Sequence, residues 1–364
     1  MLVSELETPA VLVDLDVMEL NLSRMAKYCQ SHNIKLRPHT KSHKIPELAK
    51  QQIASGASGI TVAKIGEAEV MLNSGITDIL IAYPLVGKVK ATRLGELAER
   101  AAVTVSLDSI ESAQAISEEV SARNVRADIL VELDVGFRRC GVANENEALI
   151  LAQEISELPG LSFKGLMFFP GQFVVGPMER STLRSQVNLL LDRTLDRFER
   201  ARVPISTVSG GSTPTAYDGH QFHGVTEIRP GMYIFNDRNM VGVGVASVED
   251  CALSVAVTVV STSVAGRSII DGGSKTFSSD RYLAGDGRGF GIIREDPSAQ
   301  LESFSEEHGH LNIANSAHQY KVGNRLTIIP NHVCSTVNMH DEIYGVRNGL
   351  VEEVWDVAGR GRVR

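Results

Sequence analysis

The stretch from Arg37 to Lys44 concentrates residues that can do chemistry. It holds two lysines and two histidines within six positions, directly after a proline, and it follows a strand-like apolar segment at residues 34–36. A lysine at the carboxyl end of a strand, at the mouth of an α/β core, can be partly desolvated and activated as a nucleophilic amine. The pattern therefore indicates Lys41 as a candidate Schiff-base lysine, with a solvated basic turn as the alternative.

Three further polar clusters also follow segments with strand patterns. The loop at residues 134–141 carries Arg138 and Arg139, which can reach an anionic oxygen. The stretch at 209–215 reads Ser-Gly-Gly-Ser-Thr-Pro-Thr, whose open backbone N–H groups and hydroxyls suit a phosphate. The segment at 227–237 adds an arginine, a glycine turn and a tyrosine. Ordinary solvated loops and plain turns remain the alternatives for each cluster.

His332 and Cys334 form a candidate metal pair near the far end of the chain. Residues 325–329 read as a strand, and residues two apart in an extended segment point to the same side. An imidazole and a thiolate together favour zinc or another borderline metal. Two protein ligands leave positions open for water or substrate. A buried cysteine beside a core histidine is the alternative.

The elements that must position these clusters alternate along the chain. Apolar, strand-like runs are followed by segments with helical periodicity about eight times in roughly 200 residues, which predicts a parallel sheet and a (β/α)8 barrel. A doubly wound open sheet is the alternative, although no GxGxxG follows the first strand. The predicted strands are residues 34–37, 59–62, 78–82, 103–107, 127–133, 161–169, 203–208 and 226–228.

The pattern of residue types along the chain changes after about residue 240. Residues 252–260, 268–271 and 325–329 are β-rich and separated by glycines and short turns, without helical periodicity. We expect an N-terminal strand and helix at 1–24 that packs on the β domain, a barrel at 25–240, and an all-β domain at 241–364 that carries the metal pair.

Composition limits the classes of function. The chain has 364 residues, a formal net charge of −8 and no basic run, which argues against nucleic acid as a partner. Neither a signal-peptide pattern nor an apolar stretch of membrane-spanning length occurs, and the four cysteines form no CxxC pair. We therefore expect a cytoplasmic protein with free thiols and no membrane partner.

Several motifs in the same order resemble the D-threonine aldolase and D-serine dehydratase family, pyridoxal-phosphate enzymes with an alanine-racemase-like barrel. The resemblance runs nearly end to end. The motifs are Thr-Pro-Ala at 8–10, Arg-Pro-His-Thr-Lys at 37–41, Gly-Ala-Ser-Gly-Ile-Thr-Val at 56–62, Asp-Ile-Leu at 78–80, Gly-Ser-Thr-Pro-Thr at 211–215, Gly-Val-Thr-Glu at 224–227, Glu-His-Gly at 307–309 and Pro-Asn-His-Val-Cys at 330–334.

The resemblance implies roles for particular residues. Lys41 would form the Schiff base with pyridoxal 5'-phosphate, and Arg139 would contact the cofactor's phenolic oxygen. Arg229 is similar to the arginine that faces the pyridine nitrogen in racemase relatives. His332 and Cys334 would bind a divalent metal, zinc or manganese, with magnesium as a further option. The phosphate would be held by Gly211, Ser212 and Thr213, with the backbone around Gly231, Met232 and Tyr233.

The resemblance also implies a lyase that acts on β-hydroxy-D-amino acids, usually as a homodimer. Aldol cleavage of D-threonine-type substrates to glycine and an aldehyde is the favoured reaction. The alternative is a dehydratase that converts D-serine or 3-hydroxy-D-aspartate to a 2-oxo acid and ammonia. A racemase and a non-catalytic pyridoxal-phosphate carrier are less favoured, because neither needs the metal pair and carriers usually lack the β domain.

One departure from the family concerns the proton carrier. Where relatives have a histidine close to the cofactor, this chain reads Phe-Phe-Pro-Gly-Gln at 168–172. Another group must then move protons, and the candidates are a metal-bound water and four histidines: His39, His43, His220 and His223.

Overall fold

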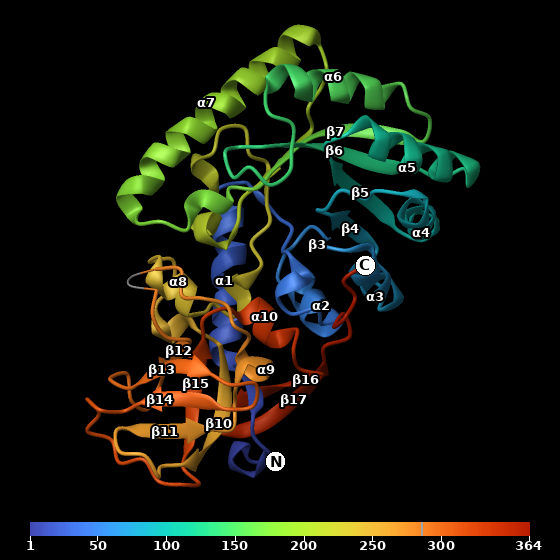
Figure 1. Cartoon of the computed structure of the whole chain (residues 1–364). Coiled ribbons are helices and arrows are strands. Elements are labelled where there is room, and N and C mark those ends of the chain that lie inside the picture. The colour runs from blue at the N-terminus through green and yellow to red at the C-terminus, as the bar shows by residue number, and fades with distance from the viewer. Residues whose placement is uncertain (285–286) are drawn as a thin grey trace. The chain divides into compact units, whose positions relative to one another are not determined.

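The computed structural model describes residues 1–284 and 287–364, and it divides into two compact units (Figure 1). The unit we call the barrel unit comprises Arg24–Lys41, Pro46–Gly231 and Gly361–Arg364. The unit we call the β unit comprises Met1–Ser23, Ser42–Ile45 and Met232–Arg360. The chain therefore passes from one unit to the other several times, directly after Lys41 among other places.

Eight parallel strands form the curved sheet of the barrel unit, which confirms the predicted TIM-type barrel class. Their order is β2-β9-β8-β7-β6-β5-β4-β3. The strands are β2 (Lys35–Leu36), β3 (Ile60–Val62), β4 (Asp78–Ile81), β5 (Ala102–Leu107), β6 (Ala127–Leu133), β7 (Leu161–Phe168), β8 (Thr207–Gly210) and β9 (Glu227–Ile228).

The two end strands of this sheet, β2 and β3, meet just beyond the end of β2. His39 and Thr61 form an isolated parallel bridge, and the Thr61 N–H donates to the Pro38 carbonyl at 2.8 Å. The residues that lead into Lys41 therefore lie at the seam that brings the ends of the sheet together.

Helices cover the outside of this sheet, as the blue-to-green part of Figure 1 shows. They are α2 (Pro46–Ala54), α3 (Ile65–Asn73), α4 (Lys88–Ala98), α5 (Ile110–Ala122), α6 (Glu145–Ser156) and α7 (Pro177–Ala201), while α1 (Leu15–Ser31) enters the barrel unit at Arg24. Apolar side chains of the strands and of the inner helix faces form a large buried core, and Leu80, Leu130 and Met167 form a smaller cluster on three of the strands. Among the described residues, none of the helices combines the length and apolar character needed to cross a membrane.

One predicted strand lies elsewhere. The apolar pattern at 203–208 predicted a strand there, but β8 runs from Thr207 to Gly210. Pro204 has no N–H to donate to a parallel ladder, so residues 203–206 serve as the connection from α7. The strand that precedes the glycine-rich stretch is thus shifted toward it.

The β unit is built on a nine-stranded, mostly antiparallel sheet. The path β13-β14-β11-β10-β1-β16-β17 places the N-terminal strand inside the sheet, between β10 and β16, and β12 and β15 extend it beside β10. The strands are β1 (Ala10–Asp14), β10 (Leu253–Ser261), β11 (Arg267–Ile270), β12 (Gly291–Ile293), β13 (Gln300–Phe304), β14 (Gly309–Asn312), β15 (Arg325–Pro330), β16 (Glu342–Arg347) and β17 (Leu350–Asp356).

The β unit also contains short helices that the sequence did not predict. They are α8 (Arg238–Gly242), α9 (Ser274–Phe277) and α10 (Val333–Val337). Each spans about one turn, which is too short to produce a helical periodicity in the sequence.

Candidate functional site

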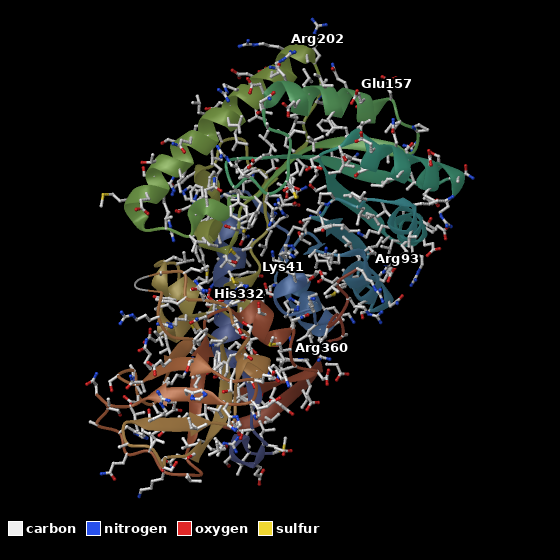
Figure 2. The ribbon with its side chains drawn as sticks, in the orientation of Figure 1. Lys41, Arg93, Glu157, Arg202, His332 and Arg360 are labelled. Carbon is white, nitrogen blue, oxygen red and sulfur yellow. The ribbon has the colours of Figure 1, made fainter. Side chains whose placement is uncertain are left out.

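Lys41 lies in a one-turn 3₁₀ helix, η2 (Thr40–Ser42), directly after the seam of the barrel. The Thr40 hydroxyl donates to the Thr61 carbonyl at 3.1 Å, which ties this turn to β3. The Lys41 side chain, labelled in Figure 2, is partly buried, and its Nζ lies 5.8 Å from the centre of the Phe169 ring. The turn thus holds a partly desolvated amine at the carboxyl end of the strands.

Phe169 stands where the family's histidine was expected, and it contacts two cations. The Arg139 guanidinium lies 4.4 Å from the centre of the Phe169 ring and also reaches toward Glu132, at 3.9 Å. Phe137 packs edge-on against Phe169, with 5.5 Å between ring centres. An aromatic ring cannot carry a proton, but it can bind cations on its face and exclude water. Position 169 therefore packs against Lys41 and Arg139.

His39 is the candidate proton carrier that lies within this cationic group. Burial of the ring lowers the pKa of His39 well below its usual value, and the charges of Lys41, Arg229 and Arg139 lower it further. The imidazole is therefore neutral at pH 7, and its Nδ1 lies 3.4 Å from the Lys41 backbone N–H. A neutral imidazole can both donate and accept a proton.

The other histidines have different surroundings. In the barrel unit, His220 bonds to the Tyr28 hydroxyl at 2.8 Å, and His223 pairs with Asp192 at the surface at 2.9 Å. His43 belongs to the β unit and is fully buried. The charged neighbours of His39 include Lys41, which makes this ring the candidate we favour.

Arg229 is buried beneath this group and bound on two sides. Its guanidinium donates to the Ser209 hydroxyl at 2.7 Å and to the Phe168 carbonyl at 2.9 Å, and Ser209 donates to Glu227 at 2.6 Å. Burial lowers the pKa of Arg229 to about 10, although Glu227 opposes the shift. Arg229 thus remains a cation at neutral pH, held by a serine hydroxyl and a backbone carbonyl.

The glycine-rich stretch after β8 has the form of an anion cradle. Gly211 adopts a φ of 90°, which favours glycine, and Ser212 caps the 3₁₀ helix η4 (Thr213–Gln221). The start of a helix leaves backbone N–H groups free to bind an anion. The Gly231 N–H donates to the Thr213 hydroxyl at 3.2 Å, so this amide supports Thr213. Met232 and Tyr233, also predicted to contact cofactor, are assigned to the β unit.

These barrel residues fit pyridoxal phosphate. An aldehyde requires an amine, which Lys41 supplies, and a phosphate requires N–H groups and hydroxyls, which the stretch from Gly211 to Thr213 carries. Arg139 and Arg229 add positive charge for the anionic parts of the ring.

His332 and Cys334 were predicted to share one side of an extended segment, and that premise is wrong. The strand β15 ends at Pro330, and Cys334 lies in the first turn of α10, for which His332 is the N-cap residue (Figure 2). The two side chains still meet, because a hydrogen bond joins the His332 ring to the Cys334 sulfur. The turn into α10 therefore brings the two side chains together, whereas the prediction relied on the alternating side-chain directions of a strand.

The pair has a third polar neighbour, Asp237, whose carboxylate lies 3.3 Å from His332 Nδ1. Burial of the His332 ring lowers its pKa, but the charges of Cys334 and Asp237 outweigh burial and raise the pKa well above its usual value. An imidazole and a sulfur fit zinc or a similar borderline metal. Within the described residues there is no group of three or more His, Cys, Asp or Glu side chains that could hold a metal ion.

Comparison with known proteins identifies the family. The model of the alanine racemase N-terminal domain matches residues 13–239, and a model described as "Putative serine dehydratase domain" matches residues 252–346. A D-threonine aldolase from an Arthrobacter species is 32% identical over 363 residues, covering 98% of this chain and 94% of the relative. The chain belongs to the D-threonine aldolase and D-serine dehydratase family. It is a lyase of the D-threonine aldolase type.

Two further relatives cover nearly the whole chain. The D-threo-3-hydroxyaspartate dehydratase of a Delftia species is 33% identical over 348 residues, 91% of this chain and 92% of the relative. The solved structure of D-threonine aldolase from Filomicrobium marinum has a TM-score of 0.92 at 33% identity and covers 100% of this chain and 98% of that one. The family thus contains aldolases and dehydratases at similar identity to this chain.

Glu132 lies outside the stretches that the sequence singled out, and no role was predicted for Ser209 or Asp237 within theirs. Glu132 and Ser209 both lie inside apolar strands, where a polar side chain signals a buried partner. Asp237 gave no such signal, because its partners lie almost a hundred positions further along the chain.

Proposed function

We propose that this lyase uses pyridoxal phosphate and a divalent metal to cleave β-hydroxy-D-amino acids of the D-threonine type into glycine and an aldehyde. The observation that carries the proposal is the placement of Lys41, the neutral His39 and the buried Arg229 around the open end of one barrel. The D-threonine aldolase relatives, similar over nearly their whole length, support the choice of substrate.

On the cofactor side, the residues have distinct tasks. Pyridoxal phosphate, when bound, supplies the electron sink for charge that develops on the substrate's α-carbon. Lys41 would hold the cofactor, and its amine is the base that this end of the barrel offers toward the substrate's α-carbon. Arg229, a cation locked by Ser209, holds positive charge toward the ring. The neutral His39 ring can accept a proton at one nitrogen while it donates at the other.

On the metal side, His332 and Cys334 are the proposed ligands. A divalent ion, when bound, supplies Lewis acidity toward the β-hydroxyl group of the substrate. Support comes from two solved structures of D-threo-3-hydroxyaspartate dehydratase variants, in which a histidine or a cysteine is replaced by alanine, two positions apart as in this chain. The cysteine variant is described as the metal-free form.

Dehydration is the second candidate reaction, because the same residues support it. Loss of the hydroxyl proton leads to cleavage of the Cα–Cβ bond, whereas removal of the α-proton by the Lys41 amine leads to loss of the hydroxyl group. The 33% identity to the Delftia dehydratase favours this alternative as much as the 32% identity to the Arthrobacter enzyme favours the aldolase. We prefer the aldolase because a D-threonine aldolase and a 3-hydroxy-D-aspartate aldolase are both at least 30% identical to this chain over nearly its whole length.

The reaction is tested by incubating the purified protein, pyridoxal phosphate and Mn²⁺ or Zn²⁺ with D-threonine, D-serine and 3-hydroxy-D-aspartate. Acetaldehyde and glycine from D-threonine are expected. Ammonia and a 2-oxo acid from the other two substrates would instead establish the dehydratase. Activity with none of the three would refute both readings.

Two controls separate the roles of cofactor and metal. Lys41→Ala should lose both the visible absorbance band of the lysine-bound cofactor and the activity. His332→Ala should keep that absorbance band and lose activity together with bound metal. Retention of the band in Lys41→Ala would contradict the role of Lys41.

A further inference from the structure

Asp237 is a fully buried carboxylate that connects two helix starts in the β unit. It is the N-cap residue of α8, and its Oδ1 accepts the Met240 N–H at 2.9 Å. Its Oδ2 accepts the Val333 N–H at 3.1 Å and lies 3.3 Å from His332 Nδ1. One side chain thus contacts both the ring of His332 and the backbone that carries Cys334.

The contact with Asp237 fixes which nitrogen of His332 is available. An ionised carboxylate only accepts hydrogen bonds, so Nδ1 must carry the hydrogen in this contact. The remaining ring nitrogen, Nε2, is then the one with a lone pair for a metal. Carboxylates that accept from the far nitrogen of a ligating histidine commonly set its tautomer and orientation.

The same carboxylate also positions the sulfur. Val333 is the first residue of α10 and Cys334 is the second, so a hydrogen bond to the Val333 amide fixes the turn from which Sγ projects. Both carboxylate oxygens of Asp237 are already bonded to N–H groups. Because Oδ2 contacts Nδ1, the carboxylate lies on the side of the His332 ring away from Nε2.

We propose that Asp237 is a positioning residue for the metal pair, which sets the His332 tautomer and the start of α10 so that Nε2 and Sγ face one ion. This inference rests on the proposed function, which assigns a divalent metal to His332 and Cys334.

The test compares the metal affinity of metal-free full-length protein with that of two variants. Asp237→Asn keeps the shape of the side chain but removes one of the two acceptors. Ser335→Ala is the matched control, because Ser335 follows Cys334 in α10 and its hydroxyl donates to Asp280 at 2.5 Å, away from His332. Zn²⁺ is titrated against a chromophoric chelator, which reports affinity without turnover.

The expected result is a loss of roughly 10- to 100-fold in Zn²⁺ affinity for Asp237→Asn, as for other residues behind metal ligands. Ser335→Ala should bind Zn²⁺ like the wild type. Equal affinity of Asp237→Asn and wild type would overturn the inference, and so would an equal loss in both variants, since loosening α10 would then suffice. A wild type that binds no Zn²⁺, or binds it equally well as His332→Ala, would instead refute the metal site of the proposed function.

A second measurement needs no variant of Asp237 and so does not depend on its folding. Long-range ¹H–¹⁵N spectra of histidine-labelled, Zn²⁺-loaded wild type report which ring nitrogen is protonated, with His332 assigned by comparison with His332→Gln. We expect a hydrogen on Nδ1 and the metal on Nε2. Metal on Nδ1 would overturn the role of Asp237.

Discussion

At the scale of single residues, the site depends on buried polar groups that satisfy one another. Ser209 accepts from Arg229 at 2.7 Å and donates to Glu227 at 2.6 Å. The Arg37 side chain donates a hydrogen bond of 2.7 Å from its Nε to the other carboxylate oxygen of Glu227. A buried group that loses its partner retains the full cost of its desolvation. This chain of hydrogen bonds from Arg229 through Ser209 and Glu227 to Arg37 therefore stabilises the barrel and also holds the Arg229 cation in place.

Ser209→Ala should lower the free energy of unfolding by about 1–3 kcal/mol, because it leaves one nitrogen of Arg229 and one oxygen of Glu227 unpaired. Denaturant unfolding of the protein checks this. Ser206→Ala is the control, since Ser206 is exposed and its hydroxyl donates to the Lys164 carbonyl at 2.9 Å. A change within about 0.5 kcal/mol is expected for it. Equal stability of the two variants would show that these hydrogen bonds do not contribute to the free energy of unfolding.

Asp296 in the β unit gives a prediction that depends on pH. Burial raises the pKa of this carboxyl, but donors from Ser298, Ser316 and Tyr320 outweigh burial and lower the pKa to about 2. A depressed pKa in the folded state contributes stability above the unfolded value, near 4, that is lost as pH falls toward 2. Asp296→Asn should therefore melt at a lower temperature than wild type at pH 7.

The difference in melting temperature between Asp296→Asn and wild type should stay constant from pH 7 to pH 5 and shrink below pH 4. Differential scanning calorimetry across this range measures it. A difference that is the same at pH 3 as at pH 7 would mean that the charge of Asp296 does not contribute.

At the scale of elements, β7 depends on one glycine. Gly165 has a φ of 148°, and a Cβ added there would lie 1.9 Å from the Thr207 carbonyl oxygen of β8. The clash is with backbone, which cannot move without breaking the pairing of β7 and β8. Because β8 leads into the phosphate cradle, this pairing sets the position of the cradle in the barrel.

Gly165→Ala should therefore destabilise the protein by more than about 1 kcal/mol and weaken pyridoxal-phosphate binding. Gly176→Ala is the control, since Gly176 has a φ of −65° and an added Cβ would meet nothing within 4 Å. Thermal unfolding and cofactor titration of both variants measure the two effects. Normal stability and cofactor affinity in Gly165→Ala would show that β7 can shift without consequence.

The elements themselves were largely predictable where the pattern is local. The strand β6 begins and ends where the sequence predicted, at Ala127 and Leu133, because a mostly apolar segment marks its extent. The strand β8 begins later than predicted, because Val203 and Ile205 suggested a strand at a position where Pro204 has no N–H to donate. The helix α10 was missed, because a single turn has no period, and the metal pair was therefore predicted for a wrong local reason.

At the scale of the whole molecule, sequence order conceals which segments pair. The strand β1 pairs with β10 antiparallel through Ala10 and Ala256, and with β16 parallel through Leu12 and Tyr344. A pattern within a short stretch of sequence does not predict contacts between residues more than 200 positions apart. The same holds for Asp237 and the His332 segment, whereas Lys41 and the glycine cradle could be found from motifs within a few residues.

The last prediction follows from the interior position of β1. Deletion of residues 1–14 removes a strand whose neighbours β10 and β16 would then each expose an unpaired, apolar edge, which favours aggregation. We expect the truncated protein to lose the β unit, as judged by rapid proteolysis after residue 232, while the barrel segment from 46 to 231 resists longer. Deletion of the exposed residues 361–364 is the control and should leave the β unit resistant. A truncated protein as resistant to proteolysis as the full chain would mean that the β unit folds without β1. The N-terminal strand would then not be needed to hold the segment that carries His332 and Cys334.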